Sequence, residues 1–148
     1  GKVFVLPKEG TATGRIVIDG SWEGEKLESS ISILIEEGII TDVSGDEKAE
    51  AIWKQMEDIR SGLRPSKAAV VGNFAEFGFG MNPRAKIIGN PLEDLVSRGA
   101  IYFGFGNNMA LGGTVNVPLH IRGVCRKATV GLEDVDLLVE GKVTAKVR

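Results

Sequence analysis

The chain has 148 residues, of which 43% are hydrophobic and 26% charged, and its formal net charge at pH 7 is −2. This is the size and composition of a soluble globular domain, and no apolar run approaches the roughly 20 residues that cross a bilayer. The opening residues lack the pattern of a signal peptide, and the chain has no basic block. We therefore expect a cytoplasmic protein without nucleic-acid or membrane partners. The single cysteine, Cys125, cannot form an internal disulfide, which fits a reducing compartment.

The domain organisation is predicted from the ends and the length of the chain. Residues 1–148 are expected to form a single domain, because about 150 residues is an ordinary domain size. The chain opens on the strand-like segment "KVFVLP", with no helix or cap before it. This opening suggests that a longer protein was cut here, and it leaves room for an upstream domain that the sequence lacks.

The first half of the chain predicts strands followed by one long helix. "GRIVIDGSW" and "SSISILIEEGIITDV" alternate apolar with polar or small residues, as half-buried strands do, and "EEG" at 36–38 predicts a hairpin turn. After these strands the apolar residues recur every three or four positions, which predicts a helix from about Asp46 to Gly62. Ser44 and Glu47 have the spacing of a capping box, and Pro65 follows as a stop signal. The apolar face of this helix consists of Ala49, Ile52, Trp53, Met56 and Ile59, of which Trp53, Met56 and Ile59 are expected to face the sheet.

The second half of the chain predicts mainly further strands. These are "KAAVVGNFAEFGFGMNPRA", "AIYFGFGNN" and the closing segments from "VNVPLHIRGV" onward, with "MALGGT" as a mobile glycine loop. "NPLEDLVSRG" predicts a short helix from Pro91 to Arg98. Few helices and many strands indicate an α+β fold: a curved mixed or antiparallel sheet of seven or more short strands, with one long and one short helix.

Two polar residues stand out because their neighbours are apolar. Glu76 lies in the middle of an apolar, aromatic run, where an ionised carboxylate needs a cation, a metal or several donors. His120, the only histidine, lies in "VPLHIRGV", and imidazole serves both as metal ligand and as general base. The residues alone leave a core role and a chemical role open for both. The glycine-rich runs "FGFG" at 77–80 and "GFGNN" at 104–108 lack the spacing of a phosphate-binding loop.

The order of several segments resembles a known metal-binding domain. These segments are "GKVFVLP", "GRIVIDGS", "NFAEFGFGMNPRAKIIGNPLEDLVSRGAIYFGFGNN" and "GGTVNVPLHIRGV". They resemble the carboxy-terminal domain of the aminopeptidase T-type metallo-aminopeptidases, a family that also includes a ring-cleaving dihydroxypyridine dioxygenase. The resemblance covers nearly the whole chain and is strongest from Gly72 to Val124. It implies a homodimer and a site in which carboxylates and imidazoles hold one or two divalent ions that polarise a peptide carbonyl.

The resemblance assigns a role to six positions. Glu76 and His120 match metal ligands of the family, whereas the other ligand positions hold Lys2, Tyr102, Asn107 and Arg122. Lys2 and Arg122 would place positive charge where a divalent cation should lie, and would give Glu76 cationic partners instead. Two ligands are too few for a tight site. The resemblance therefore predicts an aminopeptidase-like domain with a degenerate metal centre, no peptidase activity and no cofactor.

Three functions stay open from the sequence. In the first, the six positions form a pocket that binds a small molecule or a peptide end, or that supports assembly. In the second, the protein is a working aminopeptidase or a related mononuclear-metal enzyme, in which Glu76 and His120 hold zinc, cobalt, manganese or iron with ligands from elsewhere. In the third, the chain is a structural or interaction module. A homodimer is expected also because apolar segments such as "FGFGM" are poor candidates for full exposure.

Overall fold

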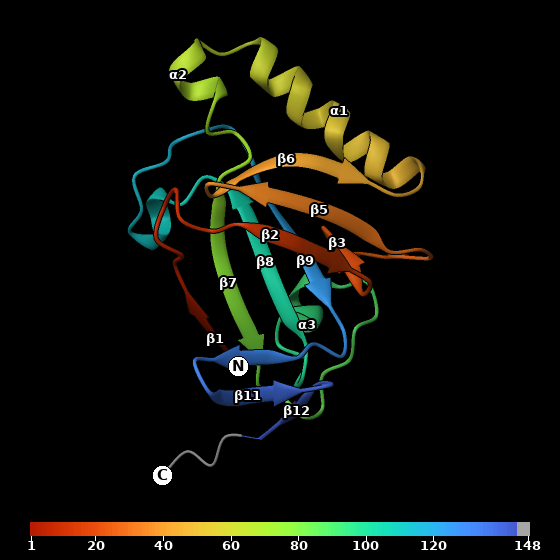
Figure 1. Ribbon diagram of the computed structural model, residues 1–148. Coiled ribbons are helices and arrows are strands. Elements are labelled where there is room, and N and C mark those ends of the chain that lie inside the picture. Colours follow the sequence, from red (N-terminus) through yellow and green to blue (C-terminus); the bar gives the residue numbers. More distant parts are fainter. Residues whose placement is uncertain (145–148) are drawn as a thin grey trace.

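The computed structural model describes residues 1–144, in which short strands form three sheets (Figure 1). The largest sheet has the strand order β1 (Lys2–Val5), β7 (Phe74–Gly80), β8 (Ile101–Gly106), β9 (His120–Cys125), β3 (Ser21–Trp22) and β4 (Glu25–Lys26). The other two have the orders β2 (Gly14–Ile18), β5 (Ile31–Glu36), β6 (Ile39–Ser44) and β10 (Val130–Leu132), β11 (Val135–Val139), β12 (Lys142–Val143). The helical segments are α1 (Glu47–Ser61), α2 (Pro65–Ala68), α3 (Pro91–Asp94) and the 3₁₀ turn η1 (Met109–Leu111).

This arrangement confirms the predicted α+β class. Within residues 1–144, every pairing between named strands is antiparallel. The largest sheet in this part of the chain has six strands, so the expected single sheet of seven or more strands is wrong. The strands form three sheets and not one because tight turns pair strands that follow each other in the sequence. The β5–β6 and β11–β12 hairpins made in this way belong to two separate three-stranded sheets.

Glu-Gly turns close these hairpins. Glu37 and Gly38, between β5 and β6, have φ values of 48° and 76°, and Glu140 and Gly141, between β11 and β12, have 46° and 77°. Positive φ at both central residues is the feature of type I′ turns, whose twist matches that of an antiparallel hairpin. The hairpin predicted at residues 36–38 is confirmed.

Helix α1 matches the predicted long helix closely. It runs from Glu47 to Ser61 with Gly62 as its C-cap, but its N-cap is Asp46, whose carboxylate accepts a hydrogen bond from the Lys48 amide at 3.0 Å. The predicted capping box of Ser44 and Glu47 is therefore wrong, because Ser44 still belongs to β6. The apolar face packs on the core as expected: Ala49, Ile52 and Met56 are buried, and Trp53 and Ile59 are half-buried.

The short helices differ more from expectation. Pro65 begins α2, which was not predicted. Helix α3 begins at Pro91 with Asn90 as its N-cap, as predicted, but ends at Asp94 and not near Arg98. It ends early because the next backbone groups pair elsewhere: the Asn82 amide donates to the Val96 carbonyl, and the Arg98 amide donates to the Asn82 carbonyl.

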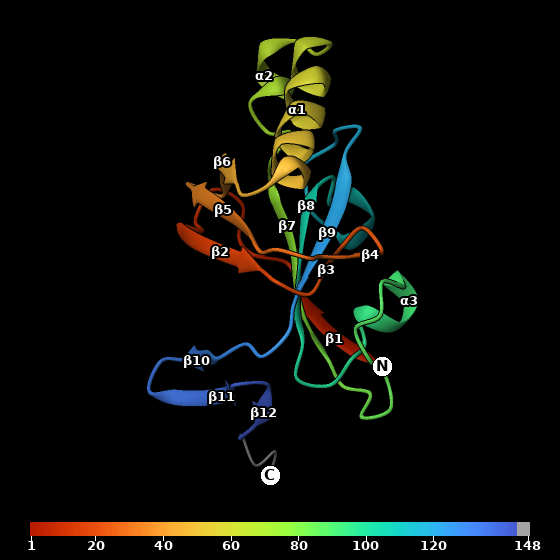
Figure 2. The same cartoon turned by 90° about the vertical axis from the view of Figure 1, so that its right-hand side faces the viewer.

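The two faces of the six-stranded sheet have different surroundings. Figure 2 shows β2, β5 and β6 on one side of the upright strands β7, β8 and β9, and α3 on the other. The main core lies on the first side, where Phe105 stacks on Trp22 with ring centroids 6.3 Å apart. A smaller apolar cluster, which contains Tyr102 and Val124, includes Leu95 beside α3. No helix within residues 1–144 is long and apolar enough to cross a membrane.

Candidate functional site

The register of four neighbouring strands places polar side chains on one face of the six-stranded sheet. Glu76 on β7 pairs with Gly104 on β8, and Gly104 pairs with Arg122 on β9. Alternate residues of a strand share a face, so Tyr102 and His120 lie on the same face as this row. Lys2 joins them from the edge strand β1, where it pairs with Gly80.

Two glycines give these side chains room above the sheet. A Cβ atom on Gly78 would lie 2.4 Å from the Tyr102 ring, and one on Gly104 would lie 2.9 Å from the Glu76 Cβ. Both distances are far below van der Waals contact, so larger residues at these positions would displace the ring or the carboxylate. The glycine-rich runs that were weighed as phosphate loops therefore serve to accommodate Tyr102 and Glu76.

The buried Glu76 carboxylate is the centre of the site. Its Oε1 accepts a hydrogen bond from the Tyr102 hydroxyl at 2.7 Å and lies 3.6 Å from Lys2 Nζ. Its Oε2 accepts from Arg122 Nε at 3.0 Å and lies 3.8 Å from His120 Nε2. Glu76 is 1% exposed, whereas the three basic side chains are each about 30% exposed and reach the carboxylate from the surface. We call these five residues the Glu76 cluster.

The charges in this cluster fix the protonation of its two buried members. Burial raises the pKa of Glu76, but the hydrogen bonds from Tyr102 and Arg122, together with the charges of Arg122 and Lys2, outweigh burial and bring that pKa below its ordinary value. Burial and the hydrogen bond to the Glu76 carboxylate both raise the pKa of Tyr102. At neutral pH, Glu76 is therefore ionised and Tyr102 is a protonated donor.

Asn107 contributes through its backbone and through its loop. Its carbonyl oxygen lies 2.8 Å from His120 Nδ1, and since a carbonyl only accepts, Nδ1 carries a proton. The Asn107 side chain donates to Asn116 Oδ1 and to the Val117 carbonyl, both at 3.2 Å. Of the six positions singled out from the sequence, Glu76 and four others thus form the Glu76 cluster. Asn107 lies outside this cluster but accepts a hydrogen bond from His120.

A cavity of about 580 Å³ opens beside the Glu76 cluster, and one wall of it was not predicted. His120, Arg122 and Asn107 form its polar part. The apolar wall comes from the loop after β8, part of which was expected to be mobile but contains the turn η1; its lining residues are Ala110, Leu111, Val117, Pro118 and Leu119. The alternation of apolar residues around Val117 is the only signal in the sequence that pointed to this wall.

Glu9 anchors the same loop from the far end of the chain. Its carboxylate accepts hydrogen bonds from Asn108 Nδ2 and from the Thr114 amide, both at 2.8 Å. These bonds lower the pKa of Glu9, so the anchor is ionised at neutral pH. Nothing in the sequence around Glu9 indicates a contact with residues about a hundred positions away.

The Glu76 cluster does not fit a divalent metal ion. Within residues 1–144, no group of three or more His, Cys, Asp or Glu side chains is arranged to hold one. Each oxygen of Glu76 already faces a cationic side chain, and the chain has one histidine. A divalent cation between these groups would be repelled by Lys2 and Arg122 while gaining one carboxylate and one imidazole.

Comparison with known proteins corrects the family inferred from the sequence. Residues 1–145 match the model of the NicX family, described as 2,5-dihydroxypyridine 5,6-dioxygenase. The fold superposes on the solved structure of a 2,5-dihydroxypyridine dioxygenase from Pseudomonas putida KT2440 with a TM-score of 0.81 and 25% identity, over 97% of this chain and 43% of that chain. The present chain thus spans less than half the length of that dioxygenase. No curated protein matches the chain.

These matches overturn the aminopeptidase T assignment and the hydrolase function that came with it, because both are to a 2,5-dihydroxypyridine dioxygenase and neither is to a peptidase. From the sequence, the dihydroxypyridine dioxygenase was named only as a further member of the aminopeptidase T family. The family match and the structural match both lead to this dioxygenase. The chain belongs to the NicX family, the family of 2,5-dihydroxypyridine 5,6-dioxygenases.

Proposed function

We propose that this chain is the ring-binding domain of a 2,5-dihydroxypyridine dioxygenase-like protein. The cavity beside the Glu76 cluster takes a small hydroxylated nitrogen heteroaromatic ring. The observation that carries this proposal is the two-sided lining of the cavity, which is apolar at Leu111 and Val117 and polar at His120 and Arg122. A flat ring buries its faces against the apolar side and presents its oxygen and nitrogen atoms to the polar side.

The polar side offers both a donor and an acceptor to such a ring. Arg122 donates to Glu76 through Nε, and within residues 1–144 no hydrogen bond engages its terminal amino groups, which can donate to a ring oxygen. In the neutral imidazole, the proton on His120 Nδ1 leaves Nε2 as an acceptor for a ring hydroxyl. Glu76 is a positioning residue, because it lies behind Arg122 and orients the guanidinium toward the cavity.

We assign ring binding to this domain, and not ring cleavage. Dioxygen chemistry requires a metal or a comparable cofactor, and non-haem iron is typically held by two histidines and one carboxylate. The dioxygenase family thus agrees with the conditional expectation of a divalent metal, iron among the candidates. The residues of the Glu76 cluster do not fit such an ion, so the proposal gives them the binding of the ring and no part in holding a metal.

Titration with 2,5-dihydroxypyridine, followed by calorimetry, tests the proposal. We expect saturable one-to-one binding that weakens at least tenfold in Arg122→Ala, because the variant loses the donor to the ring oxygen. Arg84→Ala is the matched control, since Arg84 is exposed and does not line the cavity. Absence of binding, or an equal loss in both variants, would contradict the proposal.

A further inference from the structure

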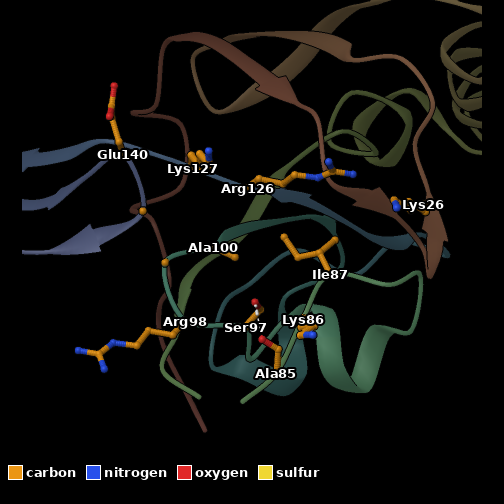
Figure 3. A pocket seen from close by; sticks show the side chains of 12 residues that line it. Lys26, Ala85, Lys86, Ile87, Ser97, Arg98, Ala100, Arg126, Lys127 and Glu140 are labelled. Atoms are coloured by element: carbon orange, nitrogen blue, oxygen red, sulfur yellow. Dashed lines mark hydrogen bonds between the residues drawn. The ribbon is translucent and has the colours of Figure 1, made fainter. Parts of the chain in front are cut away.

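A second cavity, of about 450 Å³, lies elsewhere on the domain and shares no lining residue with the first (Figure 3). Its walls come from β4, from the segments before and after α3, from the end of β9 and from the β11–β12 turn. Five of its lining side chains are basic and one is acidic; they are Lys26, Lys86, Arg98, Arg126, Lys127 and Glu140. We call it the Arg126 cavity.

This concentration of positive charge contrasts with the chain as a whole. The protein carries 20 acidic and 18 basic residues, so an average surface would surround basic side chains with carboxylates. The ion pairs found within residues 1–144 instead involve basic residues outside the Arg126 cavity. Basic side chains that line one hollow without ion-pair partners repel one another and favour an anion there.

Arg126 supplies the most specific observation. Its Nε atom is buried and has no hydrogen-bond partner within residues 1–144, although a guanidinium donor removed from water normally has one. Its backbone is fixed, because the Arg126 amide donates to Asp19 Oδ1 at 2.8 Å. In Figure 3 the side chain runs across the cavity in the direction of Lys26, whereas Arg98 extends away from both. Because Nε itself is closed off from the cavity, an oxyanion there would accept hydrogen bonds from the terminal amino groups at the end of the Arg126 side chain.

The wall opposite Arg126 is held in place by the protein itself. The Ser97 hydroxyl donates to the Ala85 carbonyl at 3.1 Å, which joins the two segments that flank α3 (Figure 3). A Cβ atom on Gly99 would lie 2.1 Å from the Gly141 carbonyl oxygen, so the β11–β12 turn packs directly on the backbone at Gly99. The cavity is therefore formed by packed backbone segments and not only by long surface side chains.

The geometry points to a binding site for a compact small-molecule oxyanion with two or three negative charges, such as a phosphate ester or a di- or tricarboxylate. No aromatic side chain lines the cavity, so it offers no stacking surface for a nucleobase. Its apolar lining is limited to Ala85, Ile87 and Ala100, which suits a ligand with a small carbon skeleton. A hollow of about 450 Å³ accommodates a small molecule, whereas a nucleic acid or a membrane surface needs a wider basic face.

Calorimetric titration of the protein at low ionic strength with pyrophosphate, inorganic phosphate and citrate tests this site. We expect saturable one-to-one binding of at least one of the three, and the preference between phosphate and carboxylate probes identifies the class of ligand. Binding should weaken at least tenfold in Arg126→Gln and in Lys127→Glu. Arg84→Gln, which removes an exposed arginine outside the lining, should leave it unchanged.

Two kinds of result would overturn the inference. One is that none of the three anions binds, or that Arg126→Gln and Lys127→Glu bind them as tightly as the unchanged protein. The other is that single-stranded RNA or anionic lipid vesicles bind while the small anions do not. Lys127→Glu alters an exposed residue, so it keeps the test valid if Arg126→Gln fails to fold. Because the lining is separate from that of the ring cavity, failure here leaves the ring-binding proposal intact.

Discussion

The Glu76 cluster and the Arg126 cavity both gather basic side chains, but they differ in what balances the charge. Around Glu76, one buried carboxylate accepts hydrogen bonds from Tyr102 and Arg122 and faces Lys2. Among the residues that line the Arg126 cavity, the one carboxylate, Glu140, forms no ion pair within residues 1–144, and a buried guanidinium nitrogen has no acceptor. The basic side chains of the first group share a buried carboxylate, whereas those of the second have no ion-pair partner within residues 1–144. The composition of the sequence gives the number of charged residues but not their positions in the fold, so it does not distinguish the Glu76 cluster from the Arg126 cavity.

Glu76→Gln should have the largest effect on stability. The variant leaves Arg122 and Lys2 close together without the buried carboxylate, and we expect a loss of about 2–3 kcal/mol in the free energy of unfolding, because the basic partners are partly solvated. Glu140→Gln is the matched change in the Arg126 cavity and should alter stability by less than about 0.5 kcal/mol. Urea denaturation of both variants measures the difference. Equal losses would mean that Glu76 is no more tightly held than a surface carboxylate.

Two arginine variants, one in each region, should change the free energy of unfolding in opposite directions. Arg122→Met removes the partner of a buried carboxylate, so we expect a loss of about 1–2 kcal/mol. Arg126→Met removes a donor that has no acceptor and keeps an unbranched apolar stem, so stability should stay constant or rise by up to about 1 kcal/mol in the absence of anions. Thermal unfolding in an anion-free buffer compares them. A loss in Arg126→Met as large as in Arg122→Met would show that Arg126 has a partner in solution.

Local patterns were sufficient for the elements whose determinants lie close together in the chain. Helix α1 was predicted within a residue at each end, because its period and its Gly62 cap are local. Glu76 stood out because one charge lay in an apolar run. The length of α3 was not predictable in the same way, because backbone bonds between Asn82 and residues 96–98 end it.

The remaining errors have a common cause in contacts between distant segments. Strand partners set the division into three sheets, and Lys26 and Arg126 reach the same cavity from positions a hundred residues apart. The family assignment failed for a related reason. It depended on metal-ligand positions, and four of the six candidate positions hold Lys2, Tyr102, Asn107 and Arg122, so the motifs carried little weight in choosing between a peptidase and a dioxygenase.

The pH dependence of stability should also single out the Glu76 cluster. The pKa of Glu76 in the folded protein is below its ordinary value of 4.5, so the unfolded chain takes up this proton first as the pH falls. The stabilising contribution is complete above pH 4.5 and is lost as the pH falls through the lowered pKa, with a slope of up to about 1.4 kcal/mol per pH unit.

The measurement is the difference in unfolding free energy between the unchanged protein and Glu76→Gln, from pH 7 down to pH 3. Glu9 also has a lowered pKa, but it is present in both proteins, so its contribution cancels. The difference should be constant above about pH 5 and should shrink below it. A difference that is the same at every pH would show that Glu76 has the same pKa in the folded and unfolded protein.

The smallest effect on stability is expected at the edge strand β1, which carries Lys2 to the Glu76 cluster. β1 pairs with β7 on one side only, and its Val3, Phe4 and Val5 side chains are 55%, 42% and 53% exposed. An apolar edge strand is a template for pairing with another chain, so the predicted homodimer would add a second copy here. Val3→Lys should change the unfolding free energy by less than about 0.5 kcal/mol but shift the mass in sedimentation equilibrium from dimer to monomer. Val17→Lys, at an exposed valine outside β1, is the control and should keep the dimer. A monomer mass for the unchanged protein at all concentrations would refute the homodimer.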